Sequence, residues 1–110
     1  MKLPNWENAY IPPPKLVGSL LSATHAVGRP KARFWRAIGF DEMSVEMLER
    51  GLLTIAYSED VKEVVSSPHG MKYLIEGTFQ TPTGRTVQVG TVWIIETSQN
   101  RPRFVTADPG

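Results

Sequence analysis

The sequence predicts an α+β fold in which two to three N-terminal helices pack on one face of a three- to four-stranded antiparallel sheet. Apolar residues recur at helical spacing up to about residue 57, and they alternate with polar residues after it. Turn-forming segments separate the alternating stretches, which predicts hairpins that join the strands into a meander. At 110 residues the chain is expected to form a single domain over 1–110.

The first half of the chain is expected to supply the helices. A proline-rich segment over 4–14 predicts extended backbone, part of which adds to a sheet edge at 9–11. Proline near a helix start and glycine or a capping residue at its boundary then delimit three helices. The predicted helices cover 15–22, 30–38 and 44–56. In the third, apolar residues recur at helical spacing, and Gly51 interrupts the helix at some cost in stability.

The second half is expected to supply the sheet, with strands at 61–65, 71–80, 85–96 and 103–107. Alternation in the third of these directs its odd-numbered apolar residues to the core, namely Val87, Val89, Trp93 and Ile95. Gly90 in mid-strand is a candidate for a β-bulge, which would switch the facing of its neighbours. The last strand forms an edge that could pair with a second copy.

Composition excludes several classes of function. The chain has no cysteine, which excludes a disulfide framework, a thiolate metal site and thiol catalysis, and fits a reducing compartment. No apolar stretch is long enough to span a membrane and no secretory signal is present, so we expect a cytoplasmic protein without a membrane partner. A net charge of +1 does not favour global attraction to nucleic acid. Motifs for cofactors and metals are missing, so neither is expected.

A dense run of cations lies in the predicted second helix. Arg29, Lys31, Arg33 and Arg36 occupy eight residues without an acidic residue. The three arginines fall on one side of the helix, where guanidinium groups could bind phosphate as a nucleic-acid contact. The alternative is a solvated face whose arginines pair with nearby acids. Lys31 falls among the apolar positions, so it either extends around the helix end or points toward a phosphate site.

The chain has two histidines, His25 and His69, and histidine is the residue type that titrates near neutral pH. Both lie in predicted loops. A pair of histidines can act as base and acid in RNA cleavage without a metal, while cations stabilise the charge on phosphorus. Arg85 beside a hairpin and Thr106 in the last strand could present side chains at one sheet edge. Incidental loop histidines and ordinary sheet packing are the alternatives for these residues.

The residues resemble a known but uncharacterised bacterial domain family of about this length. The resemblance rests on Asn8-Ala-Tyr-Ile-Pro, on His25-x-x-Gly-Arg-x-Lys-Ala-x-Phe, on Thr91-Val-Trp-Ile-Ile and on Pro102-Arg-Phe-Val-Thr-Ala, and it spans nearly the whole chain. The chain is more distantly similar to the barnase, EndoU, colicin and RelE-like ribonuclease toxins, which often end on Thr-Ala-Tyr-Pro. Here Asp108 replaces that aromatic residue, which removes a base-stacking group and adds a negative charge.

Two functions follow as hypotheses. The ribonuclease resemblance implies RNA as a partner and, by position, a catalytic set of His25, Lys31, Arg85 and Thr106, with His69 as a further member. In that set His25 is the general base or acid, Lys31 and Arg85 bind and stabilise the phosphate, and Thr106 orients it. The alternative is a non-catalytic interaction module that binds a cognate protein, which the near-neutral charge favours. The sequence does not specify the oligomeric state.

Overall fold

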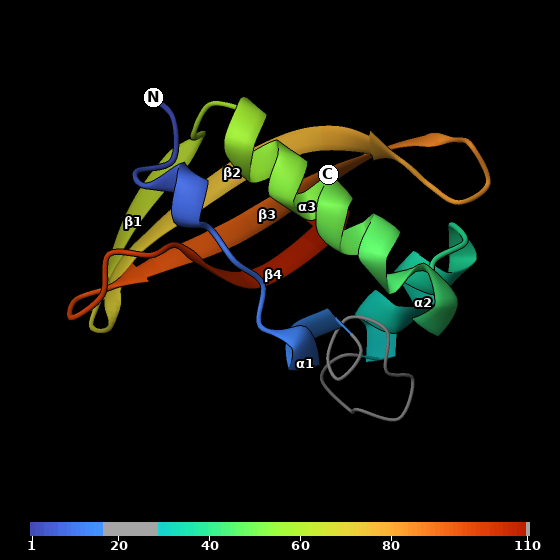
Figure 1. Cartoon of the computed structure of the whole chain (residues 1–110), viewed down its shortest axis with the longest axis horizontal. Coiled ribbons are helices and arrows are strands. Elements are labelled where there is room, and N and C mark those ends of the chain that lie inside the picture. Colours follow the sequence, from blue (N-terminus) through green and yellow to red (C-terminus); the bar gives the residue numbers. More distant parts are fainter. Residues whose placement is uncertain (17–28, 110) are drawn as a thin grey trace.

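The computed structural model describes residues 1–16 and 29–109, and the side chains of 29–32 and of residue 109 are outside that description. Its centre is a four-stranded antiparallel sheet in the order β1-β2-β3-β4, so each strand pairs with the next along the chain (Figure 1). The strands are β1 (Glu63–Ser67), β2 (Gly70–Gln80), β3 (Thr86–Glu96) and β4 (Arg103–Pro109). The predicted α+β meander is therefore confirmed.

Helices precede the sheet in the chain, as predicted. The described helical elements are η1 (Trp6–Asn8), α1 (Pro13–Lys15), α2 (Arg29–Ala37), η3 (Glu42–Ser44) and α3 (Val45–Ser58). The predicted helix over 15–22 is described only at its start, where Leu16 is buried, and the remainder lies outside the described residues. None of the described helices is long and apolar enough to cross a membrane.

The helix α3 lies directly on β2 and covers one face of the sheet (Figure 1). Its inward residues are Leu48, Leu52, Ile55 and Ala56. Glycine at position 51 permits this close approach, because a Cβ there would lie 2.5 Å from a ring carbon of Phe79. The predicted cost of Gly51 in a helix is therefore offset by tighter contact between helix and sheet.

Aromatic side chains fill the core between α2, α3 and the sheet. Trp35 is fully buried, its ring stacks on Phe79 at a centroid distance of 6.2 Å, and it meets Phe34 and Phe40 edge-on. Trp93 donates a hydrogen bond of 2.9 Å to the Thr91 hydroxyl, which satisfies the buried indole nitrogen. The apolar side of α2 is thus what anchors this helix to the domain.

The bulge predicted at Gly90 is wrong, because β2 and β3 keep an unbroken register from Gly70↔Glu96 to Gln80↔Thr86. The irregularity lies instead between β3 and β4, where Val105 is the extra residue between the pairs Val92↔Thr106 and Trp93↔Phe104. That extra residue allows Phe104 and Ala107, three positions apart, both to be buried in the core.

The N-terminal segment closes the outer edge of β4. Tyr10 forms a parallel bridge with Arg103: its amide donates to Pro102 at 3.0 Å, and its carbonyl accepts from Phe104 at 3.0 Å. The predicted contribution of residues 9–11 to a sheet edge is confirmed at Tyr10. The start of β4 is consequently occupied within the same chain, and this part of the edge is not open to a second copy.

Candidate functional site

The two faces of the sheet differ in what covers them. Odd-numbered residues of β2 and β3 point toward α3, because Phe79 lies against Gly51 of that helix and Gly77 lies against Ile55. Even-numbered residues point the other way, and we call this side the open sheet face. Across the strands it carries the rows Lys72↔Ile94↔Arg103, Leu74↔Val92↔Thr106 and Glu76↔Gly90↔Asp108. Half-buried charged residues stand on it beside aliphatic ones.

A hollow of about 420 Å³ at one end of the open sheet face collects positive charge. We call it the basic hollow, and it is lined by Lys15, His69, Lys72, Ile94, Glu96, Arg103 and Val105. These residues come from α1, from the turn between β1 and β2, and from three strands, so only the tertiary structure brings them together. The hollow holds three cations, one histidine and one carboxylate.

The carboxylate of the basic hollow is bound to one of its cations. Oε1 of Glu96 accepts hydrogen bonds from Nε of Arg103 at 3.0 Å and from Nη2 at 2.7 Å. Lys15 and Lys72 form no ion pair with any residue in the described part of the chain. The hollow therefore carries an excess of positive charge, which attracts anions.

A second hollow, of about 210 Å³, adjoins it along the open sheet face and has the opposite character. Its floor contains Leu74, Gly90 and Val92, and its rim holds Glu63, Glu76 and Asp108. Lys62 pairs with Glu76 at 3.0 Å and so offsets part of this negative charge. The open sheet face therefore changes from basic to acidic along its strands.

Two of the predicted catalytic residues are on the side of the open sheet face without being in contact, and a third is far from both. His69 is at the basic hollow, and Thr106 is on the same face, one row from Arg103. Arg85 is exposed in the hairpin loop at the other end of β2 and β3. Since a strand rises about 3.3 Å per residue, the 11 residues of β2 separate His69 from Arg85 by roughly 30 Å. One phosphate cannot contact both.

The remaining predicted residues belong to α2 or precede it. His25 lies outside the described residues. Arg29 and Lys31 are in α2, but their side chains lie outside the description, so neither alternative for Lys31 is decided. Arg33 is exposed.

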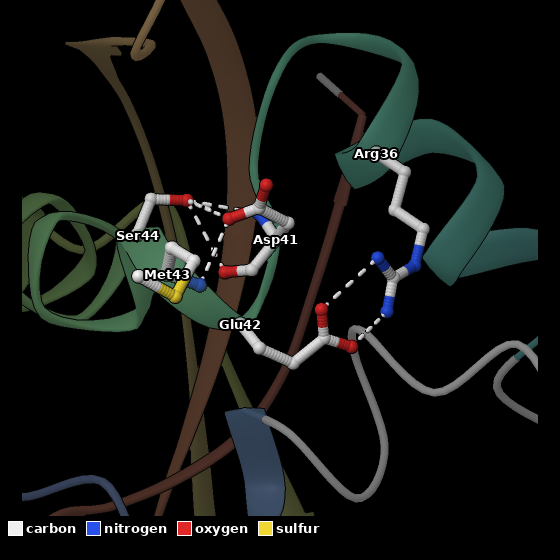
Figure 2. A network of polar contacts seen from close by, with 5 residues as sticks. All are labelled: Arg36, Asp41, Glu42, Met43 and Ser44. Atoms are coloured by element: carbon white, nitrogen blue, oxygen red, sulfur yellow. Dashed lines mark hydrogen bonds and ion pairs between the residues drawn. The ribbon is translucent and has the colours of Figure 1, made fainter.

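Arg36 pairs with an acidic residue that follows it in the chain. Figure 2 shows its guanidinium reaching Glu42, with one nitrogen bonded to Oε1 and Nη1 at 3.3 Å from Oε2. This hydrogen bond raises the pKa of Arg36 and lowers the pKa of Glu42. Glu42 is held in place because Asp41 and Ser44 cap η3 reciprocally. Of the two alternatives for the arginines, the pairing with a nearby acid is the one observed at Arg36.

Sequence reasoning missed Lys15, Lys72, Glu96 and Arg103. Alternation in 71–80 placed Lys72 on the polar side of its strand, but nothing in the sequence pairs it with Arg103, which is 31 residues away. The register of three strands is needed to see that both flank Ile94. One signal was available in the sequence: Lys72 follows His69 by three residues, so the two were expected near the same end of a strand.

Comparison with known proteins gives a family and a fold. No curated protein matches the chain. A solved chain described as "Contact-dependent growth inhibition toxin - immunity protein complex from Klebsiella pneumoniae 342" is similar to it, with a TM-score of 0.71 over 96% of both chains. At 15% identity this likeness shows the fold alone. A family model described as "Domain of unknown function (DUF6883)" matches residues 2–110, so the predicted membership of an uncharacterised family is confirmed, and the chain belongs to the DUF6883 family.

Proposed function

We propose that this chain is a toxin-type domain that cleaves RNA without a metal ion, with the open sheet face as its active surface. One observation carries the proposal: the sheet face opposite α3 presents a histidine and an excess of cations around one hollow. The resemblance to ribonuclease toxins and the fold shared with a chain of a toxin–immunity complex support it. RNA as a substrate implies that the domain acts in a cytoplasm.

The chemistry needs a base, an acid and a phosphate site. A base removes the proton of the 2′-hydroxyl, the 2′-oxygen attacks phosphorus, and an acid protonates the departing 5′-oxygen. The products are a 2′,3′-cyclic phosphate and a 5′-hydroxyl, so no oxidant or further reactant is required. His69 and His25 are the proposed acid–base pair, and cations stabilise the negative charge that develops on the phosphoryl oxygens.

The other predicted residues keep more limited roles in this proposal. Thr106 is on the open sheet face and orients the phosphate through its hydroxyl. The cations of α2, Arg29, Lys31, Arg33 and Arg36, contact flanking phosphates, with Arg36 the weakest contributor because Glu42 already binds it. Arg85 is assigned no contact with the scissile phosphate, since it stands at the far end of the sheet from His69.

Cleavage of total bacterial RNA by the purified chain in EDTA tests the proposal. His69→Ala and His25→Ala should each reduce the rate by roughly 100-fold or more if they are base and acid. Arg50→Gln is the matched control, because Arg50 is exposed on α3, on the covered side of the sheet. A large loss in Arg85→Gln with none in His69→Ala would move the site to the hairpin end. Absence of cleavage at large enzyme excess would overturn the proposal.

A second function is favoured by the complex from which the similar solved chain comes. That chain is named with a protein partner, so a non-catalytic module that binds a cognate protein is the alternative for this chain. The two functions differ in one property that is simple to measure. An interaction module has no affinity for RNA, whereas a ribonuclease loses RNA affinity steeply as salt rises.

A further inference from the structure

Lys15 and Lys72 of the basic hollow have no acidic partner among the described residues, unlike several other cations of the chain. Lys2, Arg36 and Lys62 each lie within 4 Å of a carboxylate: Asp60, Glu42 and Glu76, respectively. Lys15 and Lys72 pair with no carboxylate of the described residues, although both are half-buried in the hollow. Holding unpaired cations close together costs free energy that a bound anion would recover.

The register of the strands gives the hollow a defined width. Lys72, Ile94 and Arg103 are direct neighbours on β2, β3 and β4. Since paired strands are about 4.8 Å apart, the backbones of Lys72 and Arg103 are roughly 10 Å apart. Ile94 lies between them and is only 4% exposed, so the floor is apolar. That gap, with a cation on each side, suits one tetrahedral oxyanion.

Glu96 orients the guanidinium of Arg103. Because a single carboxylate oxygen accepts from both Nε and Nη2, one edge of the guanidinium is fixed. Within the described residues Nη1 makes no hydrogen bond, so its N–H groups are available to a ligand. A carboxylate in an anion site weakens binding by its charge, and this arrangement is useful only if orientation outweighs that repulsion.

We infer that the basic hollow is a binding site for a phosphate-class oxyanion, held between Lys72 and Arg103 over Ile94, with Lys15 and His69 at its rim and Glu96 as a positioning residue. This deepens the proposed function, because an RNA phosphodiester is the ligand that function would supply. The anion site itself depends on the described contacts and not on cleavage. It therefore has its own test.

Titration with inorganic phosphate at constant ionic strength, followed by backbone amide NMR of the full chain, measures binding at the hollow. Amides of residues 69–72, 94–96 and 103 should shift together. Lys72→Gln and Arg103→Gln should each raise Kd by roughly tenfold, the value of one charge-assisted contact. Arg50→Gln is the control and should leave Kd unchanged. The amide spectrum of each variant also reports whether it is folded.

Two substitutions of Glu96 separate orientation from simple repulsion. Glu96→Gln keeps an oxygen that accepts from Arg103 and removes the negative charge, so phosphate should bind as well as in the parent chain or more tightly. Glu96→Ala removes the acceptor as well, and binding should be several-fold weaker than in Glu96→Gln. If Glu96→Ala instead binds phosphate as tightly as Glu96→Gln, Glu96 acts by charge alone and its positioning role is overturned.

Competition with a short single-stranded RNA distinguishes the sources of the phosphate. Displacement of phosphate from the hollow by RNA supports both the anion site and the proposed function. Phosphate binding that RNA does not displace keeps the anion site and counts against the proposed function. RNA binding without phosphate shifts at the hollow overturns the anion site and leaves the function open at another face. If neither phosphate nor RNA shifts the amides of the hollow, the inference is overturned.

Discussion

The chain has two basic regions, and they are built in opposite ways. In α2 four cations lie within eight consecutive residues, whereas the cations of the basic hollow are contributed by α1, β2 and β4. Yet Arg36 of α2 is paired with Glu42, while Lys15 and Lys72 of the hollow have no acidic partner in the described part of the chain. A high density of cations in a sequence therefore does not show which of them are paired with an acidic residue in the folded protein.

The largest expected effect concerns what anchors α2. Trp35 is fully buried among aromatic rings, so Trp35→Ala should lower the free energy of unfolding by about 3–5 kcal/mol. Arg33→Gln, on the exposed side of the same helix, should change it by less than about 0.5 kcal/mol. Urea denaturation measures both. Equal effects of the two substitutions would show that the charged side also contributes to folding stability.

The second-largest expected effect is the difference between the two basic regions in their contribution to RNA affinity. Replacing Lys72 and Arg103 together by glutamine should weaken RNA binding by about 100-fold at low salt, taking each charge-assisted contact as worth about tenfold. The matched double variant Arg33→Gln with Arg36→Gln should weaken it by only a few-fold, because Glu42 already occupies Arg36. Fluorescence anisotropy with a labelled oligonucleotide provides the measurement. The reverse order would place the RNA on α2.

Salt dependence sharpens the same contrast. For single-stranded RNA the slope of log K against log salt changes by about 0.7 for each phosphate that the protein no longer neutralises. The double substitution in the basic hollow should reduce the slope by about 1.4, which corresponds to two such phosphates. The double substitution in α2 should reduce it by half of that or less. Equal slopes in both variants would mean that the two regions contribute equally to phosphate binding.

The smallest expected effect is the pH dependence of the pair between Arg36 and Glu42. The hydrogen bond from Arg36 lowers the pKa of Glu42 below its ordinary value of 4.5, so the stabilisation is present above that value. It is lost as pH falls and the carboxylate is protonated. The melting temperature of Glu42→Gln should therefore be slightly lower than that of the parent chain at neutral pH, with the difference vanishing in acid. A difference that persists unchanged in acid would contradict the ion pair as its source.

Much of the fold could be predicted from the sequence because its signals are local. Alternation over 85–96 and helical spacing over 44–56 reflect which side of each element is buried, and both elements form close to the predicted bounds. The bulge was predicted wrongly at Gly90, because glycine allows a bulge but does not require one. The observed bulge lies where it lets both Phe104 and Ala107 be buried. The site was less predictable, since strand pairing joins residues that are far apart in the chain.

The family to which the chain belongs is carried by motifs in the sequence. The sequence by itself also determined the α+β class and the order of helices and strands. These depend on local periodicity, which a folded core obeys because apolar surface is removed from water. The tertiary structure alone decided that Arg85 stands apart from His69, that Arg36 binds Glu42, and that Lys72 and Arg103 flank one apolar floor. Charges interact through space, and the register of the sheet sets which of them are near.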